Sequence, residues 1–250
     1  MFIHNIDPVL LRIGFLEIRY YGIIFALGFL LTYFFLRYLS KQRNLEFDLD
    51  NFLLYQFIGV LVGARFFEVF IYNFSLYSSD IFSWFAVWNG GLSFHGGLIG
   101  SIIATLIFCK KYKLDFYKIA DITVIPVALA LALGRIANFI NSEIYGRITS
   151  VPWAVKFQNA EGFRHPSQIY ESMKNFFIFF ILWFIKDKKL PNGFMFWSFI
   201  FLYSTLRFSI EFFREPTRHG LIYGLTFGQL LNIPLIIIGL YFLIKYRKVY

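Results

Sequence analysis

The chain has 250 residues, of which 58% are hydrophobic, 22% are aromatic and only 16% are charged. An ordinary soluble domain is about 45–50% apolar and about 25% charged, so the composition argues against a soluble core and indicates an integral membrane protein. The net charge of +9 does not predict nucleic-acid binding, because the basic residues are distributed as membrane topology requires. Cys109 is the only cysteine, which excludes an internal disulfide, and there is no Cys/His cluster to predict zinc.

The first 19 residues contain Asp7, Pro8, Arg12, Glu17 and Arg19. They do not resemble a cleavable signal peptide, and we expect them to lie along the membrane surface. After them, long apolar stretches predict about seven transmembrane helices, since about 20 apolar residues cross a bilayer. The expected spans are residues 20–39, 52–72, 91–109, 119–141, 168–185, 191–212 and 224–244. We therefore expect an all-α protein with a single polytopic domain over residues 1–250.

The distribution of Lys and Arg predicts the orientation of these spans. One set of alternate loops holds 13 basic residues: Arg37, Lys41, Arg43, Lys110, Lys111, Lys113, Lys118, Lys186, Lys188, Lys189, Lys245, Arg247 and Lys248. The other set holds seven: Arg12, Arg19, Arg147, Lys156, Arg164, Arg214 and Arg218. Because cytoplasmic loops carry the excess of positive charge, we expect the N-terminus outside and the C-terminus in the cytoplasm.

The polar residues inside the expected spans lie mostly toward the outer face. They are Tyr20, Tyr21, Arg65, Glu68, His95, Arg135, Asn138, Gln168, Glu171, Lys174, Asn175, Tyr203, Arg207 and Glu211. Asp121 is the main exception on the cytoplasmic side. Ionisable groups inside a bilayer are costly and usually face a cavity or a partner. A single Arg could simply reach the interface, but clusters at one shared depth favour a site in the outer leaflet.

Two of these clusters differ in their interpretation. Tyr203, Arg207 and Glu211 are spaced i, i+4, i+8 and share one helix stripe. Arg before Glu is the less favourable order for a stabilising pair, which favours a functional role. Arg65 and Glu68, spaced i, i+3, are more typical of a structural ion pair.

Glycines in the second and third spans predict a close helix contact. Gly59 and Gly63 have the small-xxx-small spacing, and so do Gly96 and Gly100 in "FHGGLIGS". His95 starts that motif and is a candidate functional residue, although an isolated His in an apolar setting is usually only hydrogen-bonded.

The other histidines are weaker candidates. We expect His4 and His219 to be exposed and inert, and His165 to belong to a capping turn before Pro166.

The stretch "GRIANFINSEIYGR", residues 134–147, ends the fourth span. Arg135, Asn138 and Ser142 fall at i, i+3, i+7, so we expect them to line one helix face, with Gly146 ending the helix. Glu143 follows the helix end, where it could satisfy backbone groups that have no partner in the helix. The two guanidinium groups of Arg135 and Arg207 suit capture of a phosphate or carboxylate. This set of residues predicts a site for an anionic amphiphile such as a phospholipid headgroup.

These motifs, in this order, closely resemble the prolipoprotein diacylglyceryl transferase family. The matching stretches are "RYYG" at 19–22, "HGGLIG" at 95–100, "GRIANFINSEIYG" at 134–146, "HPSQIYE" at 165–171 and "RFSIEFFREP" at 207–216. The resemblance covers nearly the whole chain. Ala137 stands where the family more usually has Gly, a change of one methyl group that we expect to be tolerated.

The resemblance implies a seven-span enzyme of the bacterial inner membrane, with its active site toward the outer leaflet. Such an enzyme takes the diacylglyceryl group from phosphatidylglycerol and places it on the lipobox cysteine of a prolipoprotein signal peptide, forming a thioether and releasing glycerol phosphate. No cofactor and no nucleic acid are implied. The residues implied as functional are Tyr21, His95, Arg135, Asn138, Glu143, Tyr203, Arg207 and Glu211.

Within the implied reaction the nucleophile belongs to the substrate, so no catalytic cysteine is needed. Cys109 is expected at the cytoplasmic end of its span. His95 could take the thiol proton, or could orient the lipid headgroup while an Arg lowers the pKa of the thiol. A transporter and a non-catalytic scaffold are the two alternatives to an enzyme. A transporter would more often show inverted repeats and a site near the midplane, and a scaffold would not explain the shared depth of the ionisable groups.

Overall fold

The computed structural model describes residues 1–14, 16–78, 80–87, 90–215, 221–222 and 224–247. Within them the α-helices are α1 (Tyr20–Gln42), α2 (Leu49–Phe67), α3 (Phe74–Tyr77), α4 (Phe94–Tyr112), α5 (Phe116–Ile140), α6 (Ser167–Ile185), α7 (Phe194–Ile210) and α8 (Phe227–Arg247). Short helical turns are η1 (Glu68–Tyr72), η2 (Ile81–Phe85) and η4 (Glu211–Phe213). The chain forms two compact units, one of residues 1–36 and 121–250 and one of residues 37–120.

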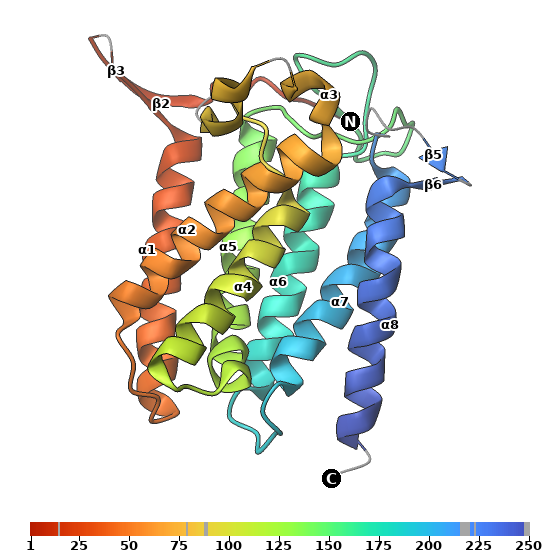
Figure 1. Ribbon diagram of the computed structural model, residues 1–250. Helices are drawn as coiled ribbons and strands as arrows, with labels where there is room; N and C mark the ends of the chain where they lie inside the picture. The colour runs from red at the N-terminus through yellow and green to blue at the C-terminus, as the bar shows by residue number, and fades with distance from the viewer. Residues whose placement is uncertain (15, 79, 88–89, 216–220, 223, 248–250) are drawn as a thin grey trace. The chain divides into compact units, whose positions relative to one another are not determined.

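Each of the seven expected spans coincides with a long helix (Figure 1). Among the described residues, four helical stretches are long and apolar enough to cross a membrane: Tyr20–Gln42, Leu49–Tyr72, Phe116–Ile140 and Phe227–Tyr246. The remaining helices α4, α6 and α7 have 19, 19 and 17 residues. These apolar helices fit a multi-pass membrane protein, while the number of seven spans and their orientation stay predictions. The single domain over residues 1–250 also stays a prediction.

Short strands precede the first helix and connect later ones. β1 (Phe2–Ile3) pairs in parallel with β4 (Val155–Lys156). β2 (Val9–Ile13) and β3 (Leu16–Arg19) form an antiparallel hairpin that leads into α1 (Figure 1). β5 (Leu221–Ile222) and β6 (Leu225–Thr226) form another hairpin before α8. The N-terminal residues are thus held by backbone hydrogen bonds.

One expectation about the N-terminal segment is wrong. His4 is not exposed: only 1% of its surface is accessible, and its Nδ1 lies 2.8 Å from the Ser142 hydroxyl. Its ring packs edge-on against Phe139, with centroids 5.1 Å apart. Because burial penalises the charged imidazolium, the pKa of His4 is lowered from its ordinary value. His219 lies outside the described residues.

In the larger unit, α7 packs against both α6 and α8 (Figure 1). The start of α7 is fixed by Asp121 of α5, whose carboxylate accepts hydrogen bonds of 2.8 Å from the backbone N–H groups of Gly193 and Phe196. These N–H groups have no partner within the helix, so a buried carboxylate stabilises them. The intramembrane carboxylate that was the exception in the sequence thus has a structural role.

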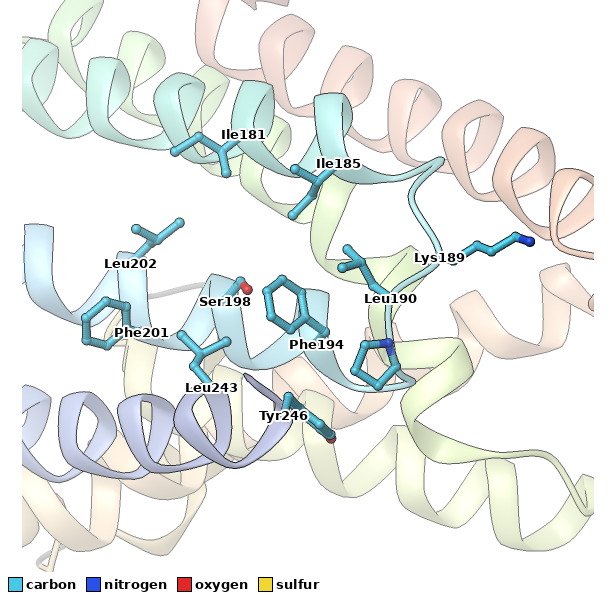
Figure 2. A pocket seen from close by; sticks show the side chains of 11 residues that line it. Ile181, Ile185, Lys189, Leu190, Phe194, Ser198, Phe201, Leu202, Leu243 and Tyr246 are labelled. Carbon is cyan, nitrogen blue, oxygen red and sulfur yellow. The ribbon is translucent and has the colours of Figure 1, made fainter. Parts of the chain in front are cut away.

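A groove of about 630 Å³ lies between the C-terminal halves of α6 and α8 and the N-terminal half of α7. Figure 2 shows aliphatic and aromatic side chains along it, with the Lys189 ammonium pointing away from them. The lining residues are Ile181, Ile185, Lys189, Leu190, Pro191, Phe194, Ser198, Phe201, Leu202, Leu243 and Tyr246. With so few polar groups in its wall, the groove suits hydrocarbon better than a polar ligand.

In the smaller unit, α2 and α4 pack through their glycines, as their spacing predicted. A Cβ on Gly59 would lie 2.7 Å from the carbonyl oxygen of Gly100, and a Cβ on Gly63 would lie 2.8 Å from Gly100 Cα. Real Cβ atoms do not approach backbone this closely, so only glycine permits this helix spacing.

The expected ion pair between Arg65 and Glu68 is not what the structure shows. Arg65 donates to the backbone carbonyls of Ser83, Trp84, Gly90 and Gly91, whereas Glu68 accepts from the Asn73 amide at 2.7 Å. The Arg65 guanidinium carries enough donors to bind all four of these carbonyls, and these hydrogen bonds take the place of the expected ion pair.

Candidate functional site

In the larger unit, the connecting segments around Gly146, His165 and Phe213 pack together. Gly146 N–H donates to His165 O, and Arg147 N–H donates to Phe213 O, both at 2.9 Å. A Cβ on Gly146 would lie 2.8 Å from His165 Cβ. Gly146 therefore does not end a helix as expected, because α5 stops at Ile140. It permits close packing of three segments.

Ser142 also differs from its expected place. It lies beyond the end of α5 with φ of +55°, and its hydroxyl contacts His4. It therefore does not share a helix face with Arg135 and Asn138. A positive φ is uncommon for a residue with a side chain, so the chain turns sharply there toward Glu143.

The most extensive polar contact in this unit is a row of charges that alternate in sign. Lys174 and Glu171 of α6 are 2.7 Å apart, and Arg207 of α7 lies 3.0 Å from the other oxygen of Glu171. Arg207 also forms an ion pair with Glu211, which lies 3.6 Å from Arg214. We call these five residues the charge row. It joins α6 to the end of α7.

The charge row is largely buried, with the side chains of Arg207 and Arg214 14% and 15% exposed. The side chains of Lys174 and Glu171 are each 2% exposed, and Glu211 also accepts a 3.0 Å hydrogen bond from the Thr226 hydroxyl. The Lys174 ammonium lies 3.8 Å from the centre of the Tyr203 ring, a favourable cation–π position. The ring of Tyr203 therefore stabilises the Lys174 end of the row.

Cations outnumber carboxylates in this row. Three basic side chains, Lys174, Arg207 and Arg214, share the two carboxylates of Glu171 and Glu211. The surplus has an electrostatic consequence: burial, together with the charge of Arg207, lowers the pKa of Arg214 to about 10. Arg214 stays protonated at neutral pH, so the row keeps its excess of positive charge in a setting where an anion would be stabilised.

Arg135 adds a further cation with a weaker partner. Its Nη1 lies 3.4 Å from the Asn138 amide oxygen, and the Asn138 amide nitrogen donates to Glu143 at 2.7 Å. Tyr21 lies within electrostatic range of both Glu143 and Arg135. The guanidinium of Arg135 thus meets a neutral amide, while the carboxylate of Glu143 serves to hold that amide in place.

His95 belongs to the smaller unit, where it lies in the first turn of α4. Its Nδ1 is 3.0 Å from the Tyr72 hydroxyl, which orients the imidazole ring. Ser93 caps the same turn, its hydroxyl accepting from Gly96 N–H at 3.2 Å. Glu171 and Tyr203 are within electrostatic range of both Arg135 and Arg207, so the sequence-predicted residues of the larger unit lie in one region. His95 is held by contacts of its own unit.

Sequence reasoning missed part of this arrangement. Glu171 and Lys174 were noted as polar residues of a span and Arg214 as a loop charge, but none was assigned to the site. The i, i+3 spacing of Glu171 and Lys174 could have indicated a pair. Their link to Arg207 depends on how α6 faces α7, which spacing along one helix does not contain.

Comparison with known proteins decides the family. The sequence profile described as "Prolipoprotein diacylglyceryl transferase" matches residues 8–245. The chain belongs to this family. A relative from Geobacter sulfurreducens is 42% identical over 254 residues, covering 98% of both chains. Relatives from Vibrio atlanticus (41% identical, covering 94% of this chain and 89% of its own) and Pasteurella multocida (42%, covering 93% and 89%) are also similar. All three carry the name "Phosphatidylglycerol--prolipoprotein diacylglyceryl transferase".

Proposed function

We propose that this chain transfers the diacylglyceryl group of phosphatidylglycerol to a prolipoprotein, the reaction for which its relatives are named. It is a transferase of lipoprotein maturation. The observation that best supports this activity in the chain itself is the buried charge row, with Arg135 in the same unit. An apolar protein that buries more cations than carboxylates is suited to an anionic headgroup.

The finer chemistry of the proposal concerns the acceptor. The thiol of the lipobox cysteine loses its proton to a base, and its sulfur attacks the carbon of the diacylglyceryl group that is bonded to the phosphate oxygen. A carbon–sulfur bond forms, the carbon–oxygen bond breaks with its electron pair on oxygen, and glycerol phosphate leaves. The product is a thioether. Because the substrate supplies the nucleophile, the buried Cys109 has no role in the reaction.

The two arginines would act on the phosphate. Charge develops on the departing phosphate oxygen, and preorganised cations lower the barrier when they face that charge. Arg207 is held by two carboxylates, whereas Arg135 meets only a neutral amide at 3.4 Å among the contacts described. We therefore assign the closer phosphate contact to Arg135 and the supporting field to Arg207.

The remaining site residues would position these groups. Asn138 and Glu143 hold Arg135 through the hydrogen bonds described, and Glu211 holds Arg207. Tyr203 lies under the row, and Tyr21, at the start of α1, would face the same headgroup.

His95 is proposed to act in the same reaction, either as the base for the thiol or as a positioner of the headgroup. A His95→Gln variant separates the two roles through the pH dependence of transfer. Loss of the acidic limb of the profile supports the base. An unchanged profile with high residual activity supports the positioner.

We further propose that the site faces the outer leaflet of the bacterial inner membrane and that seven helices span that membrane. The excess of Lys and Arg in one set of loops supports this orientation, because cytoplasmic loops carry more positive charge. In this arrangement, the lipid donor and the signal peptide both reach the site from within the bilayer.

The assay for the function uses purified protein, phosphatidylglycerol and a lipobox peptide. We expect mass spectrometry to show a diacylglyceryl group on the peptide cysteine and equimolar glycerol phosphate. A transporter or a scaffold would give neither product. Absence of the modified peptide with folded protein would contradict the proposed function.

Arg135→Gln tests the phosphate contact. Because removal of one preorganised donor typically costs about 10²–10³-fold in rate, we expect the variant to lose transfer by that factor. Arg12→Gln is the control, since Arg12 lies in the β2–β3 hairpin with 61% of its side chain exposed, and its loss should leave transfer unchanged. Near-normal transfer by a folded Arg135→Gln variant would exclude the phosphate contact.

A further inference from the structure

We infer that Lys174 is a positioning residue that sets how much of the positive charge of Arg207 is available to the lipid phosphate. The inference rests on the proposed function and assigns a role to the one residue of the charge row that lies furthest along it from Arg214. Lys174 is buried in the apolar helix α6. A buried ammonium is expensive to maintain there, so a role in the adjacent site is a physical reason for its presence.

The geometry separates the two oxygens of Glu171. Oε2 lies 2.7 Å from Lys174 Nζ, and Oε1 lies 3.0 Å from Arg207 Nη1. Lys174 therefore competes with Arg207 for one carboxylate. The competition is between residues of different helices, α6 and α7, and both side chains are shielded from solvent, so salt does not weaken it strongly.

The balance of charge shows what this competition does. With Lys174 present, three cations share two carboxylates and one positive charge is left over. Without Lys174, Arg207 and Arg214 would face Glu171 and Glu211, and the row would be neutral. A neutral row attracts a phosphate less, because the attraction follows the net charge at short range in a medium of low dielectric.

The position of Lys174 explains how this surplus is held in place. Its ammonium lies 3.8 Å from the centre of the Tyr203 ring, so the ring stabilises the part of the charge that Glu171 does not. The arrangement gives Lys174 a fixed place beside the site without a requirement that it touch substrate.

The test compares Lys174→Met with a charge-balanced double variant, Lys174→Met with Glu171→Gln. The double variant has Arg207 and Arg214 against Glu211 alone, which restores one surplus positive charge. Phosphatidylglycerol binding in mixed micelles and transfer kinetics are measured together on folded protein. We expect Lys174→Met to weaken phosphatidylglycerol binding and raise KM by about tenfold, with a smaller change in kcat, and the double variant to return close to the parent.

Lys186→Met is the matched control. Lys186 lies at the other end of α6, also over an aromatic ring (Trp183, 4.4 Å) and also paired with a carboxylate (Asp187). We expect its loss to leave both binding and KM unchanged.

Several results would overturn the inference. One is a folded Lys174→Met variant whose binding and KM stay within twofold of the parent. Another is a fall in kcat alone, as a purely structural loss of active protein would give. Because removal of one partner of a buried pair can prevent folding, the double variant also decides alone: weakened binding in it, with normal folding, contradicts the role of charge balance. If the parent protein transfers no lipid, the proposed function fails, while the binding measurements still decide the role of Lys174.

Discussion

A single buried histidine links the start of the chain to the segment that follows α5. The position of His4 near the N-terminus suggested exposure, because terminal residues are usually poorly packed. Its contacts, Ser142 and Phe139, lie more than 130 residues further along the chain. In contrast, Arg207 and Glu211 were expected to share one helix stripe, because they lie four residues apart, and they form an ion pair. Local spacing alone does not decide the partner, because Arg65 and Glu68, three residues apart, bind other groups.

The burial of His4 predicts a pH dependence of stability. Its pKa is below the ordinary value of 6.5 in the folded protein, so the unfolded state binds the proton more readily. The contribution of neutral His4 to the free energy of unfolding is therefore fully present above about pH 6.5 and decreases as the pH falls below that value. We expect the melting temperature in detergent to fall less between pH 7.5 and 5.5 in His4→Gln than in the parent. Each kcal/mol of unfolding free energy that protonation of His4 removes corresponds to about 2–4 °C of this difference.

The comparison within each protein removes the general effect of the substitution. His165, whose pKa burial also lowers, contributes in the same direction to both proteins and cancels in the difference. An equal fall in melting temperature for both proteins would show that His4 does not titrate in this range.

At the scale of elements, the apolar stretches located all the long helices, but their ends were shifted by a few residues. The second helix begins at Leu49 instead of 52, because the Asp48 carboxylate accepts the Asn51 N–H at 3.0 Å. The third expected span begins at Phe94 instead of 91, after the Ser93 cap. Hydropathy identifies the apolar interior of a helix, whereas polar caps set where it starts.

The contact of α2 with α4 predicts opposite effects for two glycines. A Cβ on Gly63 would collide with the backbone of α4, whereas one on Gly97 would meet Val60 Cγ1 at 3.5 Å, an ordinary contact. We expect Gly63→Ala to destabilise the protein by about 1–3 kcal/mol through overpacking. Gly97→Ala should be neutral or stabilising by up to about 1 kcal/mol, because Ala favours a helix.

Thermal melting of the two variants in the same detergent checks this pair. Since both substitutions add one methyl group to the same interface, a general sensitivity of the interface would lower both melting temperatures equally. That result would contradict the glycine-specific packing of Gly63.

At the scale of the whole molecule, the main prediction from the sequence is the orientation of the chain in the membrane. The only cysteine makes it testable. In a Cys109→Ser background, Glu161→Cys lies in the connection before α6 and Lys188→Cys in the connection after it, and both positions are exposed.

We expect a membrane-impermeant maleimide to label Glu161→Cys in intact cells, where the outer face is accessible after outer-membrane permeabilisation. Lys188→Cys should be labelled only after the inner membrane is opened. The reverse pattern would place the basic loops outside and would contradict the outer-leaflet site.

The pairing of β1 with β4 also constrains the time order of assembly. Phe2 of β1 pairs with Val155 of β4, 153 positions further along the sequence, and synthesis proceeds at about 5–20 residues per second. The first strand is therefore made roughly 8–31 s before its partner. In the orientation proposed above, the N-terminal residues cross the membrane during that interval, while α1 to α5 insert. The region around Arg135 is consequently completed late in biogenesis, after most of the hydrophobic helices are in place.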